Sequence, residues 1–195
     1  MGTSGSASRS QSPAEAALLH TRLGWVCVVV RDGRVIAASL PMAAKAEAAA
    51  LCPAGCRFGN RDGLLRAVVG DLRRYFRGEG VDLSRYPVDL STQPAFLRRA
   101  LLAARRIPYG EVRTYGWLAR AAGNPRAARA AGQAMSHNPV PLLIPCHRVV
   151  GTGGRLTGFG GGLALKRALL ELEGVACGAN RVASSRHDTE RGRGR

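Results

Sequence analysis

The residues best suited to covalent chemistry are Cys146 and His147, which stand side by side within residues 138–150. A thiolate is the nucleophilic form of cysteine, and a free thiol with a pKa of about 8.5 is mostly protonated at neutral pH. The adjacent imidazole and Arg148 therefore bear on its reactivity. The three prolines of this segment each fix φ and remove a backbone donor, which predicts a stiff, extended approach to the cysteine rather than a helix. The pair alone is more typical of a buried core than of catalysis, so the rest of the chain has to decide.

The charge of the chain predicts a polyanionic partner for its second half. The 195 residues carry a net charge of +16, of which residues 91–175 contribute +9. Only Lys45 and Lys166 among the 29 basic residues are lysine. Arginine forks match phosphates and base edges, so this bias fits nucleic acid, but a GC-rich genome would give the same bias. A basic surface that serves only solubility is the other interpretation.

The five cysteines are expected to be reduced thiols, because the N-terminal residues show no signal-peptide pattern. We therefore expect a cytoplasmic or nucleoid protein, or a nuclear one in a eukaryote. Cys52 and Cys56 resemble half of a zinc site, but no second Cys or His pair follows at ligand spacing, so no metal is expected. The apolar runs are too short to span a bilayer, so no membrane role is expected.

The first half is predicted to be a small α/β domain of structural purpose over residues 20–90, after a disordered N-terminus over residues 1–19. Strands over residues 24–30 and 35–38 flank a hairpin signal at Asp32 and Gly33. Residues 43–51 favour a helix, and residues 52–60 favour a loop. Asp62 is the expected N-cap of a helix that ends at Phe76.

The second half, residues 91–175, is predicted to be mostly helical. Ser91 or Thr92 can cap a first helix that ends near residue 104. A second helix capped by Thr114 and a third over residues 125–135, capped by Asn124, are separated by a tight glycine turn, as in a helix-turn-helix. The third helix has mostly small side chains, which suit close approach to DNA and equally suit burial in the core.

Two further segments complete this half. Seven glycines within residues 151–162 exclude regular structure and permit close approach to a ligand, although a flexible linker has the same composition. Phe159 within it could wall a pocket for a flat base. An amphipathic helix is expected over residues 163–173, and residues 176–195 are expected to be a disordered basic tail.

The motif Pro145-Cys146-His147-Arg148, with its flanks at residues 110–112 and 173–174, resembles the O6-alkylguanine-DNA alkyltransferases, also called methylated-DNA-protein-cysteine methyltransferases. The resemblance covers residues 94–174 densely. It implies an α+β fold with a ribonuclease-H-like N-terminal domain and a C-terminal winged helix-turn-helix. It also implies DNA repair by a single-turnover, irreversible transfer of an alkyl group from O6-alkylguanine to Cys146 after base flipping, with O4-alkylthymine as a further candidate substrate. A monomer that binds the minor groove of double-stranded DNA without a cofactor is expected.

The same resemblance assigns roles to individual residues. Cys146 is the alkyl acceptor, His147 its base acting through water, and Glu173 the carboxylate that orients the imidazole. Asn138 is the hinge, and Tyr115 donates a hydrogen bond as guanine leaves. The residues expected to bind DNA are Arg129, which fills the hole in the duplex, with Arg126, Ala128, Ala130, Thr114 and Tyr115. The residues expected to line the base pocket are Met135, Pro141, Val149, Phe159 and Gly160.

Two other classes of function remain in view. A lesion-sensing DNA-binding protein without transfer would lack the cysteine, whereas Cys146 is present here. A helix-turn-helix transcription regulator would leave the motif of Cys146, His147 and Glu173 without a purpose. A gain in protein mass after incubation with alkylated DNA distinguishes alkyl transfer from both of these classes.

Overall fold

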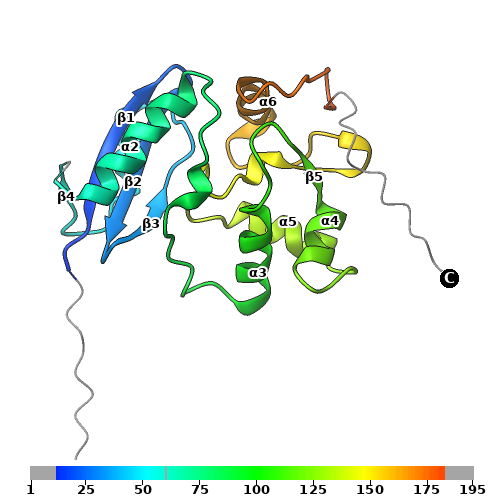
Figure 1. Ribbon diagram of the computed structural model, residues 1–195, viewed down its shortest axis with the longest axis horizontal. Coiled ribbons are helices and arrows are strands. Elements are labelled where there is room, and N and C mark those ends of the chain that lie inside the picture. Colours follow the sequence, from blue (N-terminus) through cyan, green and yellow to red (C-terminus); the bar gives the residue numbers. More distant parts are fainter. Residues whose placement is uncertain (1–11, 60, 183–195) are drawn as a thin grey trace, which may run out of the picture.

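The computed structural model describes residues 12–59 and 61–182, and within them the chain has an α+β fold with a four-stranded sheet and six α-helices. Figure 1 shows the sheet and α2 on one side of the molecule and α3 to α6 on the other. The N-terminal elements are β1 (Glu15–Thr21), β2 (Gly24–Arg31), β3 (Arg34–Ala38), α1 (Lys45–Ala49), β4 (Arg57–Phe58) and α2 (Gly63–Phe76). The later elements are α3 (Ala95–Ala104), β5 (Arg113–Thr114), α4 (Tyr115–Ala121), α5 (Ala128–Ser136), β6 (Val149–Val150) and α6 (Gly162–Leu172). Three short 3-10 helices span Leu83–Arg85, Cys146–Arg148 and Thr152–Gly154.

The strand order of the sheet is β3-β2-β1-β4, with β4 parallel to β1 and the other pairs antiparallel. The predicted hairpin between β2 and β3 is confirmed, because Asp32 and Gly33 both have positive φ values (50° and 70°), as a type I′ turn requires. The apolar run of β2 is buried on both faces. Val26 and Val28 face the core shared with α2, whereas Cys27 and Val29 face the cluster that contains Ala48 of α1.

Helix α2 begins and ends as the sequence predicts. The Asp62 carboxylate accepts a hydrogen bond from the backbone N–H of Leu65 (3.0 Å), which satisfies one of the free donors at the helix start. Leu65, Val68 and Leu72 are fully buried at helical spacing. Tyr75, on the same face, is also fully buried, and its hydroxyl reaches the second half of the molecule.

Several predicted boundaries are wrong. The expected disordered N-terminus over residues 1–19 includes most of β1, which pairs along its whole length with β2. Residues 177–182 of the expected C-terminal tail are also ordered, since Cys177 pairs with Val182 and Arg181 with Arg155. The rest of both expected tails, residues 1–11 and 183–195, lies outside the described residues.

Three helix starts also differ from expectation. Helix α3 is preceded by Pro94 rather than by a Ser91 or Thr92 cap. Helix α5 begins at Ala128 instead of residue 125, because the Asn124 side chain accepts a hydrogen bond from the N–H of Arg126 and closes a turn before the helix. The approach to the cysteine is not an α-helix, but it is turned rather than extended as predicted, because the Ile144 N–H donates to the Val140 carbonyl (3.0 Å) and Leu142 has a positive φ of 73°. Cys146 itself opens a 3-10 helix.

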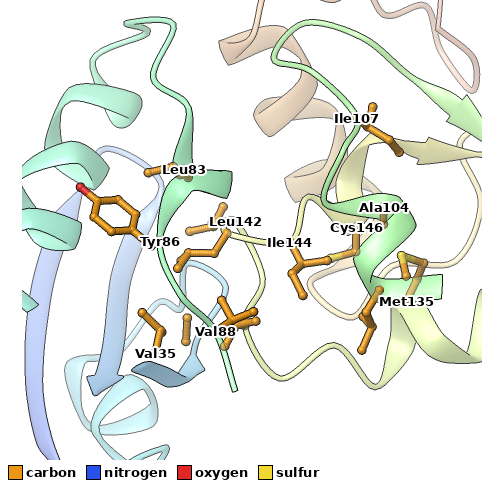
Figure 2. Close-up of a cluster of buried hydrophobic side chains, with 14 of the residues drawn as sticks. Val35, Leu83, Tyr86, Val88, Ala104, Ile107, Met135, Leu142, Ile144 and Cys146 are labelled. Atoms are coloured by element: carbon orange, nitrogen blue, oxygen red, sulfur yellow. The ribbon is translucent and has the colours of Figure 1, made fainter. Parts of the chain in front are cut away.

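One cluster of buried apolar side chains joins the two halves of the chain. Figure 2 shows it running from Val35 and Tyr86 on the side of the sheet, past Leu142 and Ile144, to Cys146. A backbone hydrogen bond from the Ala38 N–H to the Pro139 carbonyl (2.9 Å) adds a polar link between β3 and this segment. The sheet therefore supports the segment that carries the cysteine. Among the described residues, no helix is long and apolar enough to cross a membrane.

Candidate active site

Cys146 lies within a buried stretch, residues 140–150, and is only 4% exposed. Its backbone N–H donates to the Ile144 carbonyl (2.8 Å), and the Asn138 amide donates to the same carbonyl (2.8 Å). The Asn138 side chain also accepts from the Val140 N–H (3.1 Å). Asn138 thereby ties the end of α5 to the turn before the cysteine.

Burial raises the pKa of the Cys146 thiol, although hydrogen bonding by Asn138 and the positive charge of Lys166 act in the opposite direction. The net direction is upward, so the resting group is a protonated thiol. A protonated thiol is a weak nucleophile, and the reaction of Cys146 therefore needs a base within reach.

His147 has the properties of that base. The ring is fully buried, and its Nε2 lies 2.7 Å from the Glu173 Oε1. Burial lowers the pKa of His147 despite the nearby carboxylate, which keeps the imidazole neutral at neutral pH. A neutral ring that donates from Nε2 to Glu173 has its free lone pair on Nδ1. The Nδ1 atom is buried and has no hydrogen-bond partner within the residues that the structure describes.

Glu173 is a buried carboxylate with an unusually full set of donors. Besides His147, it accepts from the Tyr75 hydroxyl (2.7 Å), from Arg148 through Nε (2.8 Å) and Nη2 (2.9 Å), and from the Gly110 N–H (3.1 Å). Burial acts to raise its pKa, but the interactions with His147 and Arg148 outweigh burial and hold that pKa well below the usual range. Glu173 is therefore a fixed negative charge behind the imidazole.

A small cavity of about 60 Å³ opens beside Cys146. Four of the five residues expected to form the base pocket line it, namely Met135, Pro141, Phe159 and Gly160, together with Tyr115, Ser136, Asn138, Gly158 and Leu40. Val149 does not line it. Its side chain is fully buried in the core, and its carbonyl accepts a hydrogen bond from Lys166 instead.

Lys166 is a site residue that the sequence does not single out. Its side chain is fully buried, and Nζ donates to the carbonyls of Val149 (2.7 Å) and Thr157 (3.0 Å). The same Nζ lies 5.8 Å from the ring centres of Tyr115 and Phe159, two walls of the cavity. Burial lowers the pKa of Lys166 to about 8. The only clue in the sequence is its rarity as one of two lysines.

The residues expected to bind DNA lie on and before α4 and α5. Thr114 caps α4 by accepting from the Trp117 N–H (3.1 Å), as predicted, and Tyr115 follows it at the cavity. On α5, Arg129 is exposed while Ala128 and Ala130 are half-buried; the exposed Arg126 precedes the helix. Within residues 12–59 and 61–182, neither arginine has a carboxylate within 4.0 Å. Their charges are therefore available to an external anion.

A buried thiol, a neutral imidazole with a free nitrogen and a fixed carboxylate are the groups from which base-assisted cysteine nucleophiles are built. The family model described as "6-O-methylguanine DNA methyltransferase, DNA binding domain" matches residues 95–175. The methylated-DNA–protein-cysteine methyltransferase of Methanosarcina acetivorans is 45% identical over 110 residues, which cover 56% of this chain and 69% of that protein. The chain belongs to the methylated-DNA–protein-cysteine methyltransferase family.

Mycobacterial relatives support the same assignment. The methyltransferase of Mycobacterium tuberculosis strain H37Rv is 48% identical over 112 residues, or 57% of this chain, and the match spans 66% of that relative's length. A crystal structure of the Mycobacterium tuberculosis enzyme in complex with DNA has a TM-score of 0.69 and 33% identity, and the match covers 82% of this chain and 92% of that chain. The likeness of fold thus extends beyond the matched C-terminal region.

Proposed function

We propose that this chain repairs DNA by transferring the alkyl group of O6-alkylguanine irreversibly to its own Cys146. The observation that carries the proposal is the arrangement of Cys146 at the wall of a cavity with the neutral His147 and the fixed charge of Glu173 behind it. Family membership supports the choice of substrate, and O4-alkylthymine is a second substrate of the same chemical type.

The proposed reaction balances as a direct displacement. The Cys146 proton passes through a water molecule to Nδ1 of His147, and the imidazolium that forms is stabilised by Glu173. The sulfur attacks the alkyl carbon, an S–C bond forms, and the C–O6 bond breaks with its electron pair on guanine. The Tyr115 hydroxyl donates a hydrogen bond to the departing base. The product is a thioether, which none of these residues can hydrolyse, so each chain reacts once.

The lesion has to leave the duplex for this reaction, because the sulfur lies in a buried site. Flipping a base out costs a few kcal/mol. A cavity of about 60 Å³ is also small beside ordinary ligand pockets of roughly 300 Å³ or more, so its walls must move outward to admit the base. The glycine-rich segment that carries Phe159 and Gly160 is the wall best able to do so.

We assign DNA binding to α4 and α5 as a helix-turn-helix, with β5 and β6 in the wing, and the N-terminal part to a ribonuclease-H-like domain. The half-buried alanines and exposed Arg129 of α5 give a thin helix that fits the narrow minor groove. Arg129 is the proposed finger that fills the hole left by the flipped base, and Arg126 contacts phosphate. One monomer acts on one lesion.

The test is the intact mass of the protein after incubation with a duplex that contains a single O6-methylguanine. We expect a gain of one CH₂ group per chain, located on Cys146 and absent from Cys146→Ala. Cys177→Ala is the matched control, since it removes another free cysteine outside the site and should leave the transfer intact. Binding without any gain in mass would favour lesion sensing instead, and repeated turnover would contradict an irreversible transfer.

A further inference from the structure

Three cysteines gather in the N-terminal half, far in sequence from Cys146. The Sγ atoms of Cys27 on β2 and of Cys52, just after α1, are 3.5 Å apart. Cys56 lies near this pair, since burial and the neighbouring Cys52 raise the pKa of Cys56 to about 11. Cys27 is fully buried, whereas Cys52 and Cys56 are half-buried at the edge of the α1 cluster. All three are free thiols, and the proposed alkyl transfer uses none of them.

We propose that Cys27 and Cys52 form a reversible disulfide bond when the protein is oxidised by a peroxide. Their sulfur atoms are already in contact and need to approach by only about 1.5 Å to reach a bonding distance of roughly 2.05 Å. Cys56 is the alternative partner, but its thiol is directed to the Arg57 carbonyl (3.9 Å). The pair that is best placed to bond is therefore the one that links a central strand to the segment after α1.

The positions of the two thiols assign their order of reaction. Cys52 is reachable from solvent, and its sulfur attacks the peroxide, so that an S–O bond forms, the O–O bond breaks, and the hydroxide that leaves takes up the Cys52 proton to give the first water. Cys27 is fully buried in the core. Burial together with the neighbouring Cys52 raises the pKa of Cys27 to about 12, so this thiol stays protonated until the second step. Its sulfur then attacks Cys52, the S–S bond forms and the S–O bond breaks. The departing oxygen takes the Cys27 proton, so two thiols and one peroxide give one disulfide and two waters.

The disulfide would be connected to the active site through the strand neighbours of Cys27. The Cys27 N–H donates to the Ser39 hydroxyl (2.8 Å), and the Ser39 N–H donates to the Cys27 carbonyl (2.9 Å). Leu40, the next residue, lines the cavity at Cys146. The disulfide would thus fix the segment after α1 to the strand that holds this wall of the cavity.

The test uses the full chain, reduced first and then treated with hydrogen peroxide. Trypsin is expected to place Cys27 in residues 23–31, Cys52 and Cys56 together in residues 46–57, and Cys146 and Cys177 in two further peptides. We expect loss of two hydrogen atoms and a cross-linked pair of peptides 23–31 and 46–57. Fragmentation of that pair between Cys52 and Cys56 identifies the bonded sulfur without any variant.

Two matched variants decide between the neighbouring thiols. C56S should still form the cross-link, and C52S should lose it. Closing a loop of this length should also raise the midpoint of thermal unfolding by roughly 5–10 °C, reversibly with a reductant. A cross-link that persists in C52S, a bond within residues 46–57, or oxygen addition without any disulfide would each overturn the proposal.

Discussion

Replacing Glu173 by glutamine tests the proposed reaction most directly, since the change keeps the shape of the side chain and removes its charge. The carboxylate accepts from Tyr75, His147, Arg148 and Gly110. Two of these partners, His147 and Arg148, carry a positive charge or can take one up. Without the charge, the imidazolium that forms when His147 takes the proton loses its stabilising partner. We expect the rate of alkyl transfer to fall by about 10²–10⁴-fold, the usual contribution of a positioned base.

The same substitution also costs stability, and the two effects have to be separated. Arg148 is only 7% exposed and would keep a buried charge without its partner. Breaking a buried ion pair in this way costs about 3–5 kcal/mol, which corresponds to a fall of roughly 6–20 °C in the unfolding midpoint for a chain of this size. Glu173→Gln should therefore be assayed well below that midpoint, with the folded fraction measured by circular dichroism.

Two further variants distinguish charge from folding. In the double variant Arg148→Met with Glu173→Gln, both buried charges are gone, so most of the stability should return while the rate stays low. Asp71→Asn is the matched control, because Asp71 is another buried carboxylate that accepts from a tyrosine, Tyr86 (2.8 Å), outside the site. It should lose stability and keep its rate. Transfer at the wild-type rate by folded Glu173→Gln would refute the proposed role of the pair with His147.

Three other predictions follow from the same contacts. Arg129→Ala should weaken repair in duplex DNA much more than reaction with a free alkylguanine base. Arg66→Ala, which removes an exposed arginine of α2, is the control and should leave both reactions unchanged. Equal losses of the two reactions in Arg129→Ala would exclude the finger role. The pKa of Glu173 is held below its usual range, so its stabilising charge is present above about pH 4.3 and lost as pH falls through the folded-state pKa. The free energy of unfolding of the wild type, relative to that of the Arg148→Met, Glu173→Gln chain, should fall in acid, as measured by urea unfolding. Lys166 has a pKa of about 8 in the folded chain against an ordinary 10.5. Between these two pH values the folded state therefore binds fewer protons than the unfolded state. The stability of the wild type relative to Lys166→Met should rise from pH 8 to 10.5, as measured by urea unfolding at each pH.

Local signals in the sequence predict much of the fold. The positive-φ turn at Asp32 and Gly33, the Asp62 cap of α2 and the Thr114 cap of α4 all depend on neighbours within three residues. Strand β1 has no comparable local signal, because residues 15–21 are rich in alanine and leucine and contain only one β-branched residue. The strand forms because β2 lies beside it and supplies its hydrogen-bond partners. The predicted start of α5 is wrong because a good cap at Asn124 closes a turn instead.

The site shows the same limit. The motif at Cys146 and His147 and the resemblance around Glu173 single out these three residues from the sequence, and the structure brings His147 and Glu173 into contact. Tyr75 and Lys166 do not emerge, because each stands among apolar residues at helical spacing and has the pattern of an ordinary core position. They belong to the site because of hydrogen bonds to residues distant in sequence. Tyr75 and Glu173 are 98 residues apart, and Lys166 and Val149 are 17 residues apart. Periodicity within one helix carries no information about such partners.

These long-range contacts change the interpretation of the N-terminal half. From the sequence its purpose is structural support, and the division of the chain at residue 90 stays a prediction. The structure gives the N-terminal half several contacts with the reactive centre: Tyr75 donates to the carboxylate behind His147, Leu40 lines the cavity, and Ala38 holds the segment before Cys146 through Pro139. Removing one donor from a buried carboxylate leaves a hydrogen bond unmade, which lowers the free energy of unfolding by about 1–3 kcal/mol. The fixed charge of Glu173, and with it the basicity of His147, therefore depends on residues from both halves of the chain.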